Sequence, residues 1–312
     1  VWLKELCSRS DVAVVGLVDV NEAAARRRAE EFRLTDAVIG DDLDQVLRAC
    51  RPDIVCDCAL PLTRRQIVTT ALEHGCHVLM EKPPAASAED ARALVAAASA
   101  CDRLCAVMYN RRYLPQVAGI RASLASGAFG QPAIITSDFF LGPHFGGFRE
   151  EMEHVLLVDM AIHTFDMARW ISGTDPVDVS CMEWNPAHSW FAHGAAAVAT
   201  FRMTDNVVYS YRGAWCAEGC PTAWEGSWRL VCEKGTIVWD GGTEPGAPVT
   251  GERVSGTGGF LRPVERVAIP VPDLPRVGHG GCIEEFVSCV KRGGRPATSV
   301  DDAVRSLAMV FA

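Results

Sequence analysis

The chain lacks a long apolar run, an excess of basic residues and a paired-cysteine motif. No apolar stretch approaches the roughly 18 residues that a membrane-spanning helix requires. The 39 acidic residues outnumber the 30 lysines and arginines, which gives a net charge of −9. Binding to nucleic acid needs a basic surface, so this balance argues against such a partner. We expect a cytoplasmic protein without membrane or nucleic-acid partners.

Metal-binding patterns are also missing. The 13 cysteines include no C-x-x-C pair, and the eight histidines form no cluster along the sequence. Several cysteines lie inside apolar runs, as in 54–58 and 230–232, where a thiol behaves as a small buried hydrophobe. We therefore predict reduced core thiols and no metal site.

The first third of the chain alternates strand and helix patterns. Four apolar runs predict strands, the first of them buried on both faces: 12–19, 53–59, 77–80 and 104–108. Three capping signals predict helix starts: Asn21, Thr63 with Gln66, and Ser87 with Asp90. Strand, helix and strand at this spacing predict a parallel, Rossmann-like domain over residues 1–110.

Beyond residue 110 the pattern changes to that of an α+β domain over residues 111–312. A helix ends near Ala125, and a long amphipathic helix is predicted over 153–171. Successive strands without helices between them predict a large, open, mostly antiparallel sheet. The expected strands are 133–139, 177–184, 195–202, 207–215, 227–232 and 236–239. The Gly- and Pro-rich stretch 241–259 is predicted to be a surface loop.

Both ends of the chain fall inside helical patterns. Residues 1–6 and 303–312 have helical spacing, and no initiator methionine is present. We expect both domains to be truncated, with the last helix packing back on the first domain.

Two charged residues stand where a parallel sheet binds its ligand, beyond the carboxyl ends of the strands. Asp19 ends the first visible strand, where a carboxylate can accept both ribose hydroxyls of an adenosine. Lys82 follows the strand 77–80 and precedes Pro83, which restricts the backbone. A lysine there can stabilise alkoxide character on a substrate. The alternatives are a turn cap for Asp19 and a solvated loop lysine for Lys82.

Asp159 and His163 form the third element. Their i, i+4 spacing places both side chains on one face of the predicted helix. Imidazole, with an ordinary pKa of about 6.5, is the natural general base, and the acid can orient it. The alternative is an ordinary surface pair, while Asp166 could pair with Arg169 or Arg112.

Taken together, three segments resemble the glucose–fructose oxidoreductase/inositol dehydrogenase/MocA (Gfo/Idh/MocA) oxidoreductases. They are Val78–Pro83, Tyr109–Tyr113 and Leu157–His163. The resemblance covers essentially the whole chain, including a parallel domain followed by an open sheet. It implies an NAD(P)-dependent dehydrogenase that transfers hydride between a secondary alcohol of a sugar, polyol or cyclitol and the nicotinamide.

The resemblance also implies roles for individual residues. The catalytic residues are Lys82, Asp159 and His163, and Pro83 matches a frequently cis proline. The cofactor contacts are Asp19, Val20, Leu60, Pro61, Glu81, Lys82, Pro83 and Asn110. The substrate contacts are Lys82, Arg112, His144, Arg149, Asp159 and His163. NAD is favoured over NADP because Asp19 would repel a 2′-phosphate. A homodimer or homotetramer formed through the open sheet is expected.

Departures from the family pattern concern the cofactor turn and the substrate. No glycine-rich strand-to-helix turn is present, and the resemblance would place about 20 to 30 residues before Val1. Leu60 replaces a threonine, Arg65 stands where a histidine is common, and His154 and Val155 replace glycines. Tryptophans on or near the predicted strands suit a sugar pocket, although most are expected to pack in the core or at the subunit interface. The alternative functions are a redox-neutral NAD-dependent glycosidase or lyase, and a non-catalytic dinucleotide sensor.

Overall fold

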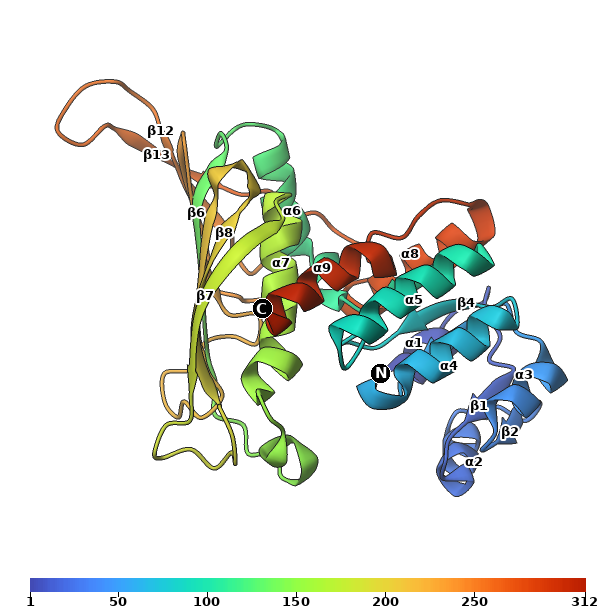
Figure 1. The fold of residues 1–312 in the computed structure, drawn as a ribbon. Coiled ribbons are helices and arrows are strands. Elements are labelled where there is room, and N and C mark those ends of the chain that lie inside the picture. Colours follow the sequence, from blue (N-terminus) through green and yellow to red (C-terminus); the bar gives the residue numbers. More distant parts are fainter. The chain divides into compact units, whose positions relative to one another are not determined.

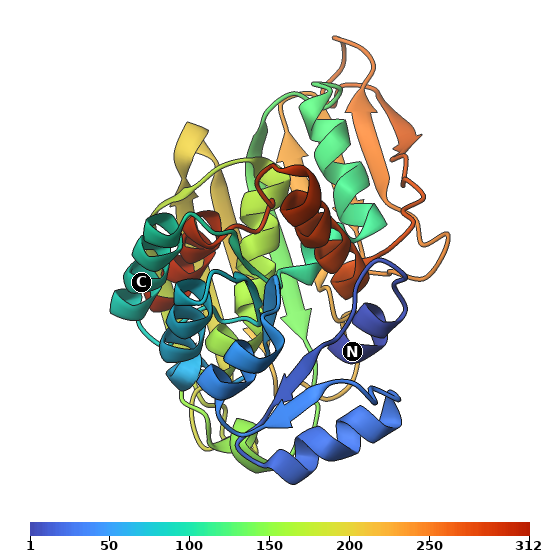
Figure 2. The same cartoon turned by 90° about the vertical axis from the view of Figure 1, so that its right-hand side faces the viewer.

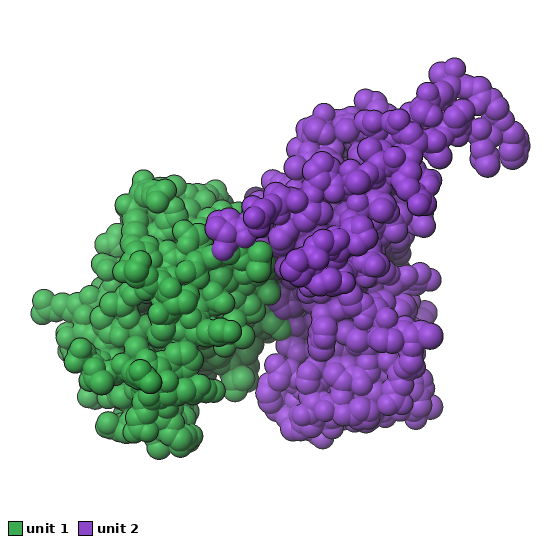
Figure 3. All heavy atoms as spheres, turned by 180° about the vertical axis from the view of Figure 1, so that it is seen from behind, with its two compact units in different colours: residues 1–110, 276–304 green, residues 111–275, 305–312 purple.

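The computed structural model describes residues 1–312, which separate into two compact units. Unit 1 comprises residues 1–110 and 276–304, and unit 2 comprises residues 111–275 and 305–312 (Figure 3). None of the helices combines the length and apolarity that crossing a bilayer requires.

Unit 1 contains two small parallel sheets. One pairs β1 (Gly16–Val18) with β2 (Val38–Gly40), beside which α2 lies in Figure 2. The other has the order β3-β4-β5, formed by β3 (Ile54–Asp57), β4 (His77–Met80) and β5 (Cys105–Val107). The helices are α1 (Trp2–Cys7), α2 (Glu22–Glu31), α3 (Leu43–Cys50), α4 (Pro61–Glu73), α5 (Ala88–Cys101) and α8 (Gly278–Arg292). The alternation of parallel strands and helices confirms the predicted Rossmann-like class.

Side-chain caps set the starts of α2 and α5, as the sequence predicted. The Asn21 side chain accepts the N–H of Ala24, and the Ser87 hydroxyl accepts the N–H of Asp90. These contacts satisfy N–H groups that a helix cannot bond internally.

Two predictions in unit 1 were wrong. Helix α4 begins at Pro61, so Thr63 lies inside it and caps nothing. Proline suits the first helical position because its φ is already helical and it has no N–H to satisfy. The strand predicted over 12–19 shrinks to β1, which is not buried on both faces. Only β2 pairs with it, so β1 lies in a two-stranded sheet rather than inside a larger one.

Unit 2 is built on an eight-stranded sheet with the order β13-β12-β11-β10-β6-β9-β8-β7. Its strands are β6 (Pro132–Phe140), β7 (Pro176–Trp184), β8 (Ala196–Met203), β9 (Val208–Ala214), β10 (Ser227–Cys232), β11 (Gly235–Trp239), β12 (Thr250–Val254) and β13 (Val264–Ala268). Every pair is antiparallel except β6 with β9. The predicted open, mostly antiparallel sheet is therefore confirmed. The stretch predicted to be a loop contains β12, so that prediction was wrong.

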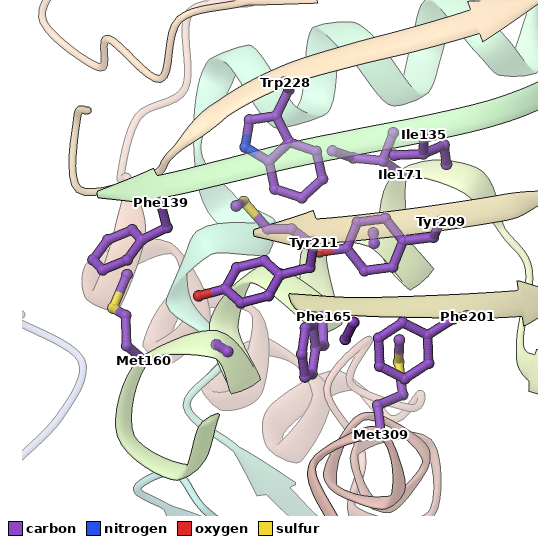
Figure 4. Packing of buried hydrophobic residues seen from close by; sticks show 14 of the residues in the cluster. Ile135, Phe139, Met160, Phe165, Ile171, Phe201, Tyr209, Tyr211, Trp228 and Met309 are labelled. Carbon is purple, nitrogen blue, oxygen red and sulfur yellow. The ribbon is translucent and has the colours of Figure 1, made fainter. Parts of the chain in front are cut away.

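Helices α6 (Pro115–Ala125) and α7 (Ile162–Ser172) lie on one face of this sheet (Figure 1). The ring of Phe165, on α7, meets the rings of Phe201, Tyr209 and Tyr211 edge-on at 5.0, 6.2 and 5.2 Å (Figure 4). Aromatic rings prefer this arrangement, which adds to the free energy gained by burying them. The helix thereby holds its polar residues at a defined place above the sheet.

The helix predicted over 153–171 differs at its start. Residues Leu156–Ala161 form a π-helical segment, η3, and only from Ile162 does α7 follow. The remaining helices are α9 (Val300–Phe311) and the 3₁₀ turns η1 (Asn110–Tyr113), η2 (Gly147–Glu151) and η4 (Thr204–Asn206). A π-helical turn wraps one more residue per hydrogen bond than an α-helical turn, a difference that apolar periodicity does not reveal.

A buried ion pair connects η1 with α7. Arg112 donates through Nε and Nη2 to the two carboxylate oxygens of Asp166, at 2.8 and 2.5 Å. The Arg112 guanidinium also lies 4.8 Å from the ring centre of Trp170. Asp166 thus pairs with Arg112, one of the two partners that the sequence left open.

Replacing Arg112 with methionine should destabilise unit 2 by about 3–5 kcal/mol, because the Asp166 carboxylate would stay buried without its cation. Chemical denaturation followed by circular dichroism measures this change. The matched control is Arg202→Met, since Arg202 and its partner Asp178 are both largely exposed and such pairs contribute about 1 kcal/mol or less. An equal decrease in the free energy of unfolding in the two variants would contradict a structural role for the buried pair.

Candidate active site

The carboxyl ends of the parallel strands carry the predicted cofactor residues of unit 1. Asp19 follows β1, and its Oδ1 accepts the N–H of Asn21 at 2.8 Å. Val20 and Leu60 are apolar yet 96% and 62% exposed. A carboxylate with a second oxygen available and exposed apolar side chains fit a ribose and the face of an adenine. Asp19 also closes a turn, so the two interpretations of this residue are compatible.

The turn after β4 holds Lys82 through its backbone. The N–H of Lys82 donates to Glu81 Oε2 at 3.2 Å, and the peptide bond from Lys82 to Pro83 is cis. The carbonyl of Pro83 accepts a hydrogen bond from Nη1 of Arg64. Contacts on both sides of Lys82 therefore fix where its side chain leaves the main chain.

Arg64 is a supporting residue that sequence reasoning missed. Its side chain is 1% exposed, and its Nε donates to Asp57 Oδ2 at 2.9 Å. Its two other nitrogens donate to the carbonyls of Pro83 and Ala59. A buried guanidinium with all of its groups bonded joins the end of β3 to the turn after β4. The available signal was an arginine one turn inside a helix that follows a strand ending in Asp57.

Two side chains, those of Trp2 and His279, contact the Glu81 carboxylate or the nearby Asn110. Trp2 Nε1 donates to Glu81 Oε1 at 2.6 Å, and His279 Nε2 lies 4.0 Å from the same oxygen. His279 Nδ1 lies 3.4 Å from Asn110 Nδ2. Because an amide nitrogen can only donate, we assign the His279 proton to Nε2, which faces Glu81.

His279 was not among the predicted residues. Burial lowers the pKa of its imidazole, because removal from water disfavours the charged form. The neutral ring bridges residues that follow β4 and β5. Its position on α8, far along the chain, left no local sequence signal.

In unit 2, Asp159 lies in η3 and His163 in the first turn of α7. The Asp159 side chain is 14% exposed and accepts a hydrogen bond from Arg149 Nε at 3.0 Å. The spacing that predicted a regular helical pair therefore spans a change from π- to α-helix. Such segments are frequent at functional sites because they redirect a side chain without ending the helix.

The loop between β6 and η3 brings aromatic and cationic side chains together. The guanidinium carbon of Arg149 lies 5.3 Å from the ring centre of Phe145 and 4.9 Å from that of Phe148. The His144 ring stacks on Trp190 at 3.8 Å, and its Nε2 lies 3.2 Å from Glu218 Oε1. This loop was predicted to contact the substrate, and Arg149 connects it directly to Asp159.

Two arginines of the motif at 109–113 are buried. Arg112 was predicted to contact the substrate, but its guanidinium is occupied with Asp166, which favours a supporting role instead. Arg111 donates through Nη2 to the carbonyl of Trp224 at 2.6 Å. Burial lowers the pKa of Arg111 to about 10.

The tryptophans divide between core and surface. Trp215, Trp228 and Trp239 are buried in the core of unit 2, whereas Trp184 and Trp224 are about half exposed. No group of three or more His, Cys, Asp or Glu side chains is arranged to hold a metal ion.

Unit 1 has parallel strands with an acid and a lysine at their carboxyl ends, and unit 2 has an acid–histidine pair above an open sheet. These features are typical of two-domain dinucleotide-dependent oxidoreductases. Comparisons with known proteins agree. Residues 3–109 match the model described as "Oxidoreductase family, NAD-binding Rossmann fold", and residues 117–238 match the "GFO/IDH/MocA C-terminal domain". The chain belongs to the Gfo/Idh/MocA family. The predictions of this family and of an NAD-binding domain are confirmed.

Known relatives include sugar and inositol dehydrogenases. A D-glucoside 3-dehydrogenase of Escherichia coli is 29% identical over 54% of this chain and 48% of its own length. An inositol 2-dehydrogenase of Rubrobacter xylanophilus is 31% identical over 49% of this chain and 44% of its own. The matches thus span about half of each of these relatives.

A solved structure shows the same fold across nearly the whole chain. It is an oxidoreductase from Agrobacterium radiobacter in complex with NAD⁺, L-tartaric acid and magnesium. The two share 18% sequence identity with a TM-score of 0.85, over 99% of this chain and 90% of the other.

Proposed function

We propose that the protein is an NAD-dependent dehydrogenase that oxidises a secondary alcohol of a sugar, polyol or cyclitol. The observation that carries this proposal is a lysine in a rigid turn after a parallel strand, in a chain that also holds an aspartate and a histidine one helical turn apart. The named activities of the relatives support an enzyme acting on CH–OH groups.

Each residue receives one role in the proposal. His163 takes the proton of the substrate hydroxyl, and Asp159 orients the imidazole or the hydroxyl. The Lys82 ammonium stabilises the developing alkoxide. Bound NAD⁺ supplies a hydride acceptor, so a carbinol loses one hydride and one proton and becomes a ketone.

The cofactor residues in the proposal lie at the carboxyl ends of β1, β3, β4 and β5. They are Asp19, Val20, Leu60, Pro61, Glu81, Lys82, Pro83 and Asn110. The carboxylate of Asp19 favours NAD because it accepts ribose hydroxyls and repels a 2′-phosphate.

The test is a dye-coupled screen of sugars, polyols and cyclitols with NAD⁺ and NADP⁺ in parallel. Stoichiometric NADH from a substrate of this class supports the proposal. Release of an aglycone from a glycoside without net NADH would select the redox-neutral alternative. Dinucleotide binding without turnover of any compound would favour a sensor.

We further propose that two copies associate through the outer face of the sheet of unit 2. Ile134 on β6 lies opposite Val208 on β9, and Met182 on β7 lies opposite Val198 on β8. All four apolar side chains are substantially exposed. Exposed apolar side chains on a sheet face are typical of protein interfaces.

Replacing Met182 and Val198 together with aspartate should shift the protein toward monomers, because two buried charges would oppose an apolar contact. Light scattering coupled to size-exclusion chromatography measures the molar mass. The control is Val264→Asp on β13, at the opposite edge of the sheet, where the valine is also exposed. A wild-type mass equal to one chain would refute the proposed association.

A further inference from the structure

Arg149 keeps most of its hydrogen-bonding capacity unused. Its Nε donates to Asp159 Oδ2 at 3.0 Å, and this is the only hydrogen bond that its guanidinium makes. A guanidinium presents five N–H donors in a planar fork, so the four N–H donors on its two Nη atoms remain for a ligand. The side chain is 37% exposed and accessible from solvent.

The position of Arg149 is nevertheless defined. The rings of Phe145 and Phe148 lie within 5.3 and 4.9 Å of its guanidinium carbon, and Asp159 holds its Nε. Contact with aromatic faces stabilises a cation and limits its movement. An arginine fixed in this way binds a planar anion at a smaller entropic cost than a freely moving surface arginine does.

The two histidines that border this loop are already engaged with acids. His144 Nε2 lies 3.2 Å from Glu218 Oε1, and His154 Nδ1 lies 2.5 Å from Glu183 Oε2. Arg149 differs from both, because its partner is the acid of the proposed catalytic pair. A ligand held by its Nη groups would therefore lie next to Asp159.

We propose that Arg149 binds a carboxylate of the substrate, so that the substrate is a sugar acid, such as an aldonic or uronic acid, rather than a neutral sugar. This inference rests on the proposed dehydrogenase function and narrows its substrate class. The guanidinium of Arg149 would contact both the Asp159 carboxylate and the substrate carboxylate. Because Asp159 acts beside the oxidised hydroxyl, that hydroxyl lies within a few carbons of the substrate carboxylate. The carbinol again loses one hydride to NAD⁺ and one proton to His163, and the carboxylate itself is not changed.

Charge favours a carboxylate over a phosphate. The same segment contains Glu150, Glu151 and Glu153, and no second arginine. A phosphate monoester carries nearly two negative charges at neutral pH, whereas this segment offers one guanidinium that already pairs with Asp159. A monoanion therefore meets less repulsion from the neighbouring acids than a dianion does.

The test compares pairs of compounds that differ only in –COO⁻ against –CH₂OH: galactonate with galactitol, and galacturonate with galactose. The wild-type protein, supplied with NAD⁺, should show a kcat/KM at least tenfold higher for the acid of an accepted pair. Arg149→Met should lower kcat/KM for the acid by about 10- to 100-fold, mainly through KM. For the neutral compound the loss of kcat/KM should be clearly smaller than for the acid, because only the contact to Asp159 is lost there, and Arg149→Lys should restore part of the preference.

The matched control is Arg253→Met, because Arg253 is also 37% exposed and also ion-paired, on the distant strand β12. This variant should keep the preference for acids. The inference would be overturned if the wild type preferred the neutral compounds, or if Arg149→Met lowered kcat/KM equally for the acid and the neutral compound. Either result would leave the dehydrogenase proposal standing. No NADH from any sugar, polyol or acid would overturn both.

Discussion

Replacing Lys82 with methionine is expected to lower kcat by about 10²- to 10³-fold while the fold survives, because a preorganised donor to the developing oxyanion is lost. Methionine has a similar length and no charge, so the change removes the ammonium and little else. The turn itself is held by backbone contacts, from Lys82 N to Glu81 and from Arg64 to Pro83 O, which do not involve the lysine side chain. Steady-state rates of NADH formation on an accepted substrate measure the effect.

The comparison for Lys82 is Lys4→Met, the same substitution at an exposed position of α1 in the same unit. This variant should retain wild-type rates. Lys82→Arg keeps a positive charge but changes its shape, so an intermediate rate would point to charge as the main contribution. Wild-type kcat in Lys82→Met, with an unchanged circular dichroism spectrum, would remove Lys82 from the mechanism.

Local sequence signals predicted most of the elements that carry the site. The run at 77–80 coincides with β4, and the caps at Asn21 and Ser87 form as expected. These signals work because a buried strand must be apolar and a helix start must satisfy its N–H groups locally. The positions of Lys82 and Asp19 at strand ends were therefore readable from the chain.

Elements that depend on pairing with distant strands could not be predicted from the local sequence. β12 has only five residues, and its Gly251 and Glu252 are of types depleted in strands, yet β11 and β13 pair with it on both sides. Gly251 fits there because a Cβ would come within 2.6 Å of the Phe129 ring. Pairing and close packing decided this strand, and neither is a local property.

The supports of the site were the hardest part to foresee. His279 reaches Glu81 and Asn110 from a helix near the end of the chain, and the one signal for Arg64 was its place one turn inside the helix that follows Asp57. Both act through neighbours rather than through a motif of their own. Reactive residues are thus easier to predict from a sequence than the residues that position them.

Replacing His163 with asparagine should lower kcat by about 10²- to 10⁴-fold, the usual contribution of a general base. In the wild type, kcat/KM should rise with pH as the base loses its proton, and in the variant this rise should vanish. Asp159→Asn should lower kcat by a smaller factor. The double variant should have a kcat only slightly below that of His163→Asn, because the effects of residues that act as a unit are not additive. His188→Asn, at an exposed position of unit 2, is the control and should leave the pH profile unchanged. If His163→Asn retained the wild-type rise with pH, another group would have to be the base.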